Sequence, residues 1–351
     1  MGTTIFSVMS ALAAESGAVN LGQGFPDFEC DPQLIADVSS AMHQGLNQYP
    51  PMPGVAPLRQ AVSEKIEKLY GHHYDPQTEI SVTAGATQAI LTIMLAVVHP
   101  GDEVIVLEPC YDCYVPNVEM AGGVVVRVPL TPGSFKPDFD KIQAAITSKT
   151  RAILINSPHN PSGMVWTREE MLQLQALLDP TDILVISDEV YEHMVFDAAL
   201  GAMHHSAVRF PGLAARAFIV SSFGKTYHCT GWKIGYCIAP KALSAGFRQV
   251  HQYNTFCSFA PAQWAFAEMI VQQPGHYAEL GDFYAAKRDY LAAKLARTRF
   301  KPLPVPGGYF QLVDYSAISD LPDAEFARWL CTEKGVAAIP LSPFYETPPA
   351  G

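Results

Sequence analysis

Apolar residues follow two alternating rhythms along this chain. Short runs rich in Val and Ile predict β-strands at residues 79–83, 103–107, 124–128, 152–156, 183–187, 217–221 and 234–239. Longer segments with apolar residues at helical spacing predict helices at residues 86–98, 168–178, 261–272 and 277–297. Strands that alternate with helices are typical of a doubly wound α/β domain.

A second, smaller domain is predicted after the last of these helices. Residues 302–308 are rich in Pro and Gly, and residues 309–313 have the pattern of a strand. The apolar stretch at residues 5–14 could be mistaken for a signal peptide, but no Lys or Arg precedes it. We interpret this stretch as an amphipathic helix.

Composition narrows the class of protein. The 351 residues are 49% hydrophobic, enough for a large core, and the net charge of -11 argues against a nucleic acid or an anionic membrane surface as partner. No apolar run reaches the roughly 18 residues that a membrane span requires. The seven cysteines are an odd count without disulfide-like spacing, so we expect a cytoplasmic protein.

Polar residues of one particular set lie at or just after the ends of predicted strands. They are Asn160, Asp188, Tyr191, Ser222, Lys225 and Lys233. Because ligands of such sheets bind outside the carboxyl ends of the strands, this placement puts the residues on one rim. Together they offer an amine, a carboxylate, a phenol, an amide and a hydroxyl, which are the groups that a pyridoxal phosphate site needs.

Each group matches one need of that cofactor. The aldehyde requires a primary amine with a pKa lowered from about 10.4, and Lys225 offers the amine. The pyridine nitrogen requires a carboxylate, Asp188, so that it stays protonated. Tyr191 and Asn160 can donate hydrogen bonds to the phenolic oxygen. The phosphate is left for Ser222 and Lys233.

Other interpretations of these residues are weaker. A phosphate-binding P-loop needs a Gly five positions before Gly224, where Ile219 stands. A solvated surface lysine would be favoured for Lys225 alone, but the spacing to Ser222 and Lys233 argues against it. The pair Cys110 and Cys113 has the spacing of half a zinc or redox site, yet no second pair matches it, so we expect no metal.

Several segments carry a resemblance to a known family. They are NLGQGFPDF (20–28), NQY (47–49), TAGAT (83–87), NSPHNPSG (156–163), SDEVYEH (187–193) and SSFGKTYHCTGWKIG (221–235). From residue 2 to about residue 344 the chain resembles the class I/II, fold-type-I aminotransferases. Within them it is most similar to the bacterial methionine aminotransferases and to the kynurenine and glutamine transaminases. The resemblance implies a mixed, mostly parallel central sheet flanked by helices in a large cofactor-binding domain of residues 46–285. It also implies a smaller α+β domain built from residues 1–45 and 286–351.

The resemblance also implies roles for further residues. Tyr111 matches the aromatic residue that stacks on the pyridine ring, and Ala86 and Thr87 open a helix whose N–H groups point at the phosphate. Tyr49 matches a tyrosine that reaches the phosphate of a neighbouring subunit, which implies a homodimer with shared sites. Substrate contacts are implied for Gly24, Phe25 and Asn160, with Phe28 as a further wall of the side-chain pocket.

The implied activity is transamination between an L-amino acid and a 2-oxo acid. Lys225 would hold pyridoxal phosphate as a Schiff base, then act as general base, with ping-pong kinetics. The implied donor is methionine, together with other neutral or aromatic amino acids. A carbon–sulfur lyase of the same fold is an alternative, because it would share Lys225.

One departure from the family pattern concerns the substrate carboxylate. Family members carry an Arg in a strand beyond the segment that matches residues 335–342, and its planar fork binds that carboxylate. This sequence ends at Gly351 without that residue, so the resemblance implies a truncated C-terminus. A truncated gene, an incomplete sequence and true loss are all compatible with this ending. A weakened pyridoxal phosphate-binding protein is therefore a further alternative.

Overall fold

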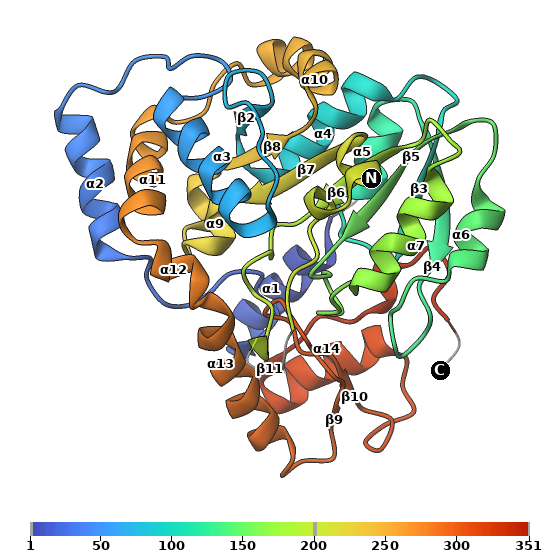
Figure 1. The fold of residues 1–351 in the computed structure, drawn as a ribbon. Helices are drawn as coiled ribbons and strands as arrows, with labels where there is room; N and C mark the ends of the chain where they lie inside the picture. The colour runs from blue at the N-terminus through green and yellow to red at the C-terminus, as the bar shows by residue number, and fades with distance from the viewer. Residues whose placement is uncertain (1–2, 199–201, 350–351) are drawn as a thin grey trace.

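A seven-stranded sheet occupies the centre of the part of the chain that the structure describes (Figure 1). The computed structural model describes residues 3–198 and 202–349. The strand order is β2-β8-β7-β6-β5-β3-β4, and the pairs are parallel except where β8 meets β2 and β7. The strands are β2 (Ile80–Thr83), β3 (Glu103–Glu108), β4 (Val124–Pro129), β5 (Thr150–Asn156), β6 (Leu184–Asp188), β7 (Ala217–Ser222) and β8 (Gly235–Ile238). The seven predicted strands are confirmed to within two residues at each end, as is the mixed, mostly parallel sheet.

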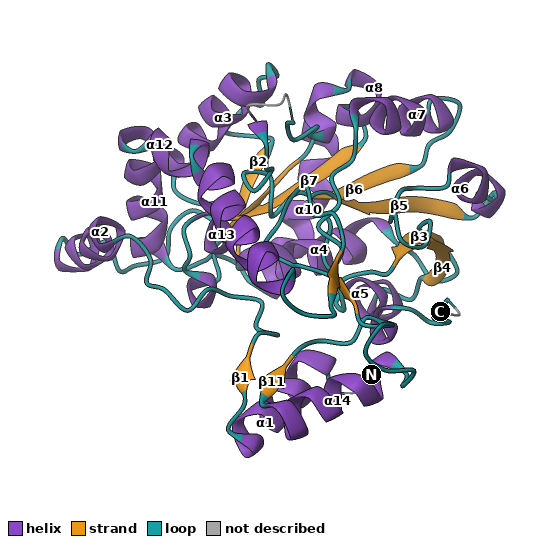
Figure 2. Ribbon diagram, turned by 90° about the horizontal axis from the view of Figure 1, so that it is seen from below, coloured by secondary structure: helices purple, strands orange, loops and turns teal. Residues whose placement is uncertain are grey.

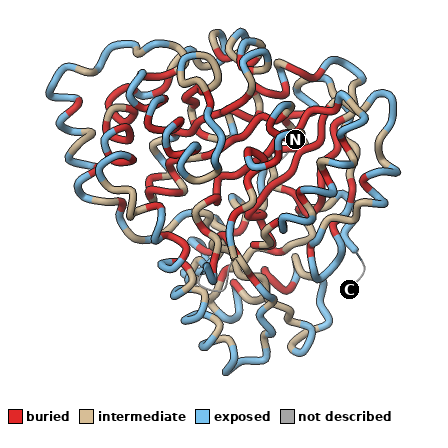
Figure 3. The backbone as a smooth tube through the Cα atoms, viewed as in Figure 1, coloured by how far each residue is buried: buried red, intermediate tan, exposed pale blue. Residues whose placement is uncertain are grey.

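Successive residues of the central strands face two separate apolar cores. In β3, Ile105 and Leu107 belong to one core, and Val104 and Val106 belong to the other. Because side chains alternate across a strand, both faces of this sheet must be covered. Figure 3 shows the buried backbone running along the sheet. Double coverage explains why these strands have near-continuous apolar sequences rather than alternating ones.

Helices supply that cover on each face (Figure 2). The first core receives residues of α2 (Pro32–His43), α3 (Ala56–Tyr70), α6 (Phe139–Ala145), α7 (Arg168–Leu178), α8 (Pro211–Ala214) and α11 (Ala260–Gln272). The second core receives residues of α4 (Gly85–Val97), α5 (Tyr114–Met120) and α10 (Lys241–Asn254). The predicted helices at 86–98, 168–178 and 261–272 are thus confirmed to within one residue as α4, α7 and α11.

Local sequence signals fix several helix ends. Thr167 and Glu170 form a reciprocal capping box at the start of α7. The N-terminal helix is confirmed as α1 (Ile5–Ser16), where the Thr4 side chain accepts from the N–H of Ser7. Gly17 ends α1 in the left-handed conformation, with φ of 61°.

Segments near the N-terminus and near the C-terminus pack against each other. Strand β1 (Val19–Asn20) pairs in parallel with β11 (Val336–Ala337), and α1 packs against α14 (Asp323–Lys334). A separate apolar cluster joins Met9 and Ala13 to Ala327, Cys331 and Ala337. This packing supports a smaller domain made from both termini. Its boundaries at 45/46 and 285/286 stay a prediction.

Two predicted elements of the C-terminal part are wrong in part. The helix predicted at 277–297 is confirmed over Leu280–Leu295 as α13, but a break at Glu279 separates it from α12 (Pro274–Ala278). Close to this break Gly281 packs against the main chain, since a Cβ there would overlap the Val195 carbonyl oxygen.

The second error concerns residues 309–313. Only Val313 of that run lies in a strand, β10 (Val313–Asp314), which pairs with β9 (Lys301–Pro302). Tyr309 and Phe310 instead pack into an apolar cluster with Tyr191, so their ring packing replaces a strand ladder. Among the described residues no helix has the length and apolar character needed to cross a membrane.

Candidate active site

A cavity of about 400 Å³ lies at the carboxyl ends of the central strands. Its wall includes Asn156, Asp188 and Ser222, which are the last residues of β5, β6 and β7. Because these strands are parallel to one another, their ends meet at one edge of the sheet. All of the predicted site residues except Tyr49 and Phe28 line this cavity. Their individual roles stay predictions.

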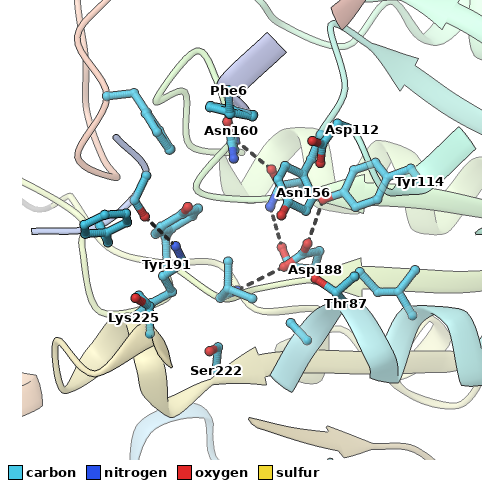
Figure 4. Close-up of a pocket in the computed structure, with 18 of the residues that line it drawn as sticks. Phe6, Thr87, Asp112, Tyr114, Asn156, Asn160, Asp188, Tyr191, Ser222 and Lys225 are labelled. Atoms are coloured by element: carbon cyan, nitrogen blue, oxygen red, sulfur yellow. Dashed lines mark hydrogen bonds between the residues drawn. The ribbon is translucent and has the colours of Figure 1, made fainter. Parts of the chain in front are cut away.

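Asp188 presents a buried carboxylate to the cavity (Figure 4). The Tyr114 hydroxyl donates to Asp188 Oδ2 at 2.7 Å, and the N–H of Val190 donates to Oδ1 at 3.2 Å. Burial raises the pKa of this carboxyl to about 6, although both hydrogen bonds favour the ionised form. Asn156 holds the backbone here, since its Nδ2 donates to the Asp188 carbonyl at 2.9 Å and its Oδ1 accepts from the N–H of Asn160 at 2.7 Å.

Lys225 lies on a single helical turn at the edge of the sheet. That turn, α9 (Phe223–Thr226), begins directly after β7, so the strand end places the lysine. Lys225 Nζ donates to the Gly24 carbonyl oxygen and to the Tyr309 hydroxyl oxygen, at 2.8 Å each. Burial, and then the nearby charge of Lys233, lower the pKa of this amine to about 8, although Asp188 acts in the opposite direction. A substantial fraction of the amine is therefore neutral near physiological pH.

A positive end faces Lys225 across the cavity. Helix α4 begins there, and its N-cap residue Ala84 makes no side-chain capping bond. The first N–H groups of α4, at Gly85, Ala86 and Thr87, are therefore left for a ligand, and the helix dipole favours an anion at this end. Lys233 adds a full charge beside them, since its Nζ lies 3.2 Å from where a Cβ of Gly85 would be.

Aromatic rings form two walls of the cavity. Tyr111 lies with its ring centroid 5.8 Å from that of Tyr114, in an edge-to-face arrangement. Tyr191 is fully enclosed, and burial raises the pKa of its phenol well above the ordinary value. Lys225 Nζ lies 5.7 Å from the centre of the Tyr191 ring. A neutral phenol and a flat ring are thus held beside the amine.

Two predicted residues lie elsewhere in this chain. Tyr49 is 83% exposed, and its ring meets that of Phe256 with centroids 5.5 Å apart. The expectation that Phe28 lines the pocket is wrong for this chain, because its ring packs edge-on against His228 and Phe283 outside the cavity. Phe25 does line the cavity, although its side chain is half-exposed.

Sequence reasoning missed several residues of the site. Tyr114 lies three residues after Tyr111, at the far end of the turn that precedes α5, and its hydroxyl reaches Asp188. Phe6 and Phe310 also line the cavity, and Tyr309 contacts Lys225. These three residues lie more than 80 positions from Lys225 in the sequence, and no local pattern links them to it.

Potential metal ligands, including the pair Cys110 and Cys113, were also considered because the sequence predicted no metal site. Within residues 3–198 and 202–349 no group of three or more potential ligands is placed to hold a metal ion. Cys110 and Cys113 are both free thiols, and burial raises the pKa of each above its ordinary value. Raised thiol pKa values disfavour the thiolate that a metal or redox site uses.

Comparison with known proteins gives consistent matches over almost the whole chain. The family model described as "Aminotransferase class I and II" matches residues 16–350. Methionine aminotransferase of Escherichia coli is 49% identical over 348 residues, covering 99% of this chain and 89% of the relative. Its crystal structure matches with a TM-score of 0.97 over 99% of this chain and 90% of that one.

The names of less similar relatives indicate other amino-group donors. A probable N-succinyldiaminopimelate aminotransferase of Mycobacterium tuberculosis is 44% identical and covers 99% of this chain and 87% of the relative. Human kynurenine–oxoglutarate transaminase 1 is 35% identical over 96% of this chain and 86% of the relative. The resemblance inferred from the sequence motifs is confirmed at the level of the family.

Proposed function

This chain belongs to the class I and II aminotransferases, a pyridoxal phosphate-dependent family, and we propose that it transfers the amino group of methionine and other neutral or aromatic L-amino acids to a 2-oxo acid. One observation supports the proposal most strongly. A single cavity holds an amine with its pKa lowered to about 8 and a carboxyl with its pKa raised to about 6. Such opposed shifts are typical of groups that exchange protons near neutrality.

The residues present fit pyridoxal phosphate. The side-chain oxygen of Asn160 is buried at the cavity and has no hydrogen-bond partner among the described residues, and α4 begins without a side-chain cap. Buried amides and open helix starts of this kind are sites for ligand atoms. We assign the pyridine nitrogen to Asp188 and the phenolic oxygen to the two donors beside it, the Asn160 side-chain NH₂ group and the Tyr191 hydroxyl.

Other residues that line the cavity are assigned to the ring face and the phosphate of the cofactor. Tyr111 is assigned to the face of the ring. The phosphate is assigned to the positive end of the cavity, formed by Ala86, Thr87, Ser222 and Lys233. Bound there, pyridoxal phosphate supplies an aldehyde that links to an amino group and a ring that accepts electrons.

The chain's own residues then perform the proton chemistry. Neutral Lys225 takes the proton from the substrate Cα as that C–H bond breaks, and later returns a proton during turnover. The ionised carboxylate of Asp188, steadied by Tyr114, favours a positive charge at the pyridine end. The phenol of Tyr191 stays protonated because it is buried, so it can donate a hydrogen bond.

The charges of the cavity favour a donor with a neutral side chain. Among its described lining residues the cations are Lys225 and Lys233, which the cofactor engages. Asp112 adds a carboxylate to the wall, and Phe6, Phe25 and Phe310 add apolar surface. A side-chain carboxylate would find repulsion and no cation there, whereas a thioether or an aromatic ring would find apolar contacts.

We also propose that two copies of this chain share their sites. Tyr49, predicted to reach the phosphate of a neighbouring subunit, lies exposed and away from its own cavity. The placement suits a contact in trans. The seven free cysteines support a cytoplasmic location, where thiols stay reduced.

A direct assay tests this function. The purified chain is loaded with pyridoxal phosphate and given L-methionine with a panel of 2-oxo acids. We expect the 2-oxo acid of methionine and the new amino acid to form in equal amounts. Release of ammonia and a thiol from sulfur amino acids, without amino transfer, would support a lyase and contradict the proposal.

A further inference from the structure

The amine of Lys225 is held by two groups that are distant from it in sequence. Its Nζ donates to the Gly24 carbonyl oxygen and to the Tyr309 hydroxyl oxygen, at 2.8 Å each. The Tyr309 hydroxyl in turn donates to the same Gly24 carbonyl. The three groups form a closed triangle whose corners come from α9, the N-terminal segment and the segment before β10.

Counting protons around this triangle fixes the direction of each bond. The Tyr309 hydroxyl gives its only hydrogen to Gly24, so its oxygen can only accept from Lys225. A neutral amine has two N–H bonds and one lone pair. Gly24 and Tyr309 use both N–H bonds, so the lone pair is left to face elsewhere.

The position of the Tyr309 oxygen is tightly determined. Its ring lies edge-on to the Tyr191 ring, with centroids 5.3 Å apart and an angle of 84°. The backbone just before it is fixed, because the N–H of Gly308 donates to the Met194 carbonyl at 2.8 Å. Burial raises the pKa of the Tyr309 phenol, so the hydroxyl keeps its hydrogen. The acceptor is thus both neutral and rigid.

We propose that Tyr309, with the Gly24 carbonyl, is a positioning residue that turns the lone pair of the free Lys225 amine toward the substrate Cα. The inference rests on the proposed function and adds to it a residue that steers the base. In the step concerned, the Cα–H bond breaks, its electron pair stays with the substrate and its proton forms a third N–H bond on Lys225. Without the Tyr309 oxygen the amine can rotate about its last carbon bond and lose this alignment.

Tyr309 could instead be a packing residue only, and the chain offers a matched control for that alternative. Tyr284 lies beside it, with ring centroids 5.8 Å apart, and its buried hydroxyl has no hydrogen-bond partner among the described residues. Tyr309→Phe and Tyr284→Phe each remove one buried hydroxyl from the same aromatic cluster. Only the first removes a contact to Lys225.

The first measurement is a single half-reaction of the loaded full chain with L-methionine carrying hydrogen or deuterium at Cα. In Tyr309→Phe we expect proton transfer to slow about tenfold, the scale of one hydrogen bond at a charged group, with a larger isotope effect. The apparent affinity for methionine should stay within about twofold of the parent. Tyr284→Phe should match the parent in all three quantities. Equal rates and isotope effects in both variants would overturn the proposal.

The second measurement needs no turnover. The full chain without cofactor is treated with an amine-reactive ester across a range of pH, and modification of the Lys225 peptide is followed by mass spectrometry. The Tyr309 oxygen stabilises the charged amine, so its removal should lower the pH midpoint of modification by about one unit. The other titratable groups facing this amine, Lys233, Asp188 and Tyr191, are unchanged in the variant.

The two measurements separate the inference from the proposed function. If Tyr309→Phe lowers the pH midpoint of Lys225 modification as expected but the parent chain transfers no amino group, the proposed function fails and the contact between Tyr309 and Lys225 stands. If the parent chain is active and Tyr309→Phe shifts neither the midpoint nor the rate, the proposed function stands and Tyr309 has no positioning role.

Discussion

At the scale of single residues, burial moves two pKa values toward neutrality from opposite sides. The pKa of the Lys225 amine is lowered to about 8, while the pKa of the Asp188 carboxyl is raised to about 6. Desolvation disfavours whichever form is charged, so one enclosed cavity acts on both groups. Tyr114 limits the shift at Asp188, because its hydroxyl donates to the ionised form.

A pH experiment tests the part played by Tyr114. Below about pH 6 the Asp188 carboxyl of the cofactor-free chain takes up a proton, so its affinity for pyridoxal phosphate should fall. In Tyr114→Phe the lost hydrogen bond raises the pKa of Asp188 further, and this fall should begin at higher pH. Fluorescence titration with the cofactor at several pH values measures the shift.

Tyr74→Phe is the control for that experiment. Its buried hydroxyl has no hydrogen-bond partner among the described residues, and it lies outside the cavity. Its titration should follow the parent curve. Coinciding curves for the parent and Tyr114→Phe would show that the hydroxyl does not tune Asp188.

At the scale of elements, a buried ion pair and its hydrogen bonds connect α3, β7 and β8 to the turn that carries Tyr191. Glu192 follows Tyr191, and its Oε1 accepts from Lys65 of α3, Ser221 of β7 and Tyr236 of β8, at 2.8 Å each. Lys65 and Glu192 are almost fully buried, with side chains 5% and 2% exposed. The Lys65 charge holds the pKa of Glu192 well below its ordinary value, despite burial.

Removing one partner of this buried ion pair should destabilise the protein. Lys65→Met leaves an uncompensated buried carboxylate, and we expect the free energy of unfolding to fall by about 3–5 kcal/mol. The double variant Lys65→Met with Glu192→Leu should lose less than the sum of the two single variants, because both charges are gone. Urea denaturation of the parent, the two single variants and the double variant measures these differences in the free energy of unfolding.

An exposed pair provides the comparison. Lys301 and Asp314 lie 4.0 Å apart on the surface, with side chains 69% and 42% exposed, so Lys301→Met should leave stability unchanged. Similar losses of unfolding free energy for Lys65→Met and Lys301→Met would contradict the larger contribution expected of the buried pair.

The elements also show how far sequence alone can lead. Buried, β-branched runs predicted the seven strands of the sheet, and strand ends predicted that Asn160, Asp188 and Ser222 share one rim. The contact of Lys225 with Gly24 spans 201 positions and that with Tyr309 spans 84. Neither periodicity nor capping encodes such contacts, because tertiary packing alone creates them. The same applies to the segment around Tyr309, where ring packing replaced the predicted strand.

At the scale of the whole molecule, the chain ends complete a cavity that the sheet begins. Phe6, Gly24 and Phe310 come from the segments assigned to the smaller domain, whereas Asp188 and Lys225 come from the sheet edge. Exposed Tyr49 is a predicted cofactor-binding residue that lies outside this cavity. A second copy of the chain is therefore proposed to complete the site.

Tyr49→Phe tests this proposed sharing. If the hydroxyl reaches the phosphate of a neighbouring subunit, its loss should weaken cofactor retention by about 1 kcal/mol or somewhat more, the scale of a hydrogen bond to a charged group. Equilibrium dialysis measures retention, and sedimentation measures assembly. Tyr290→Phe, on the exposed surface of α13, should leave both unchanged. A monomer that keeps its cofactor at full occupancy would contradict the shared site.

The central claim is that Lys225 binds pyridoxal phosphate covalently as the base of a transaminase, and borohydride reduction tests it most directly. Reduction of the loaded chain, followed by digestion and mass spectrometry, should leave the cofactor mass on the peptide that contains Lys225. Lys225→Ala should show no such labelled peptide, yet should still bind cofactor through the positive end of the cavity. Cofactor mass on another lysine, or on none in a chain that transaminates, would contradict the account.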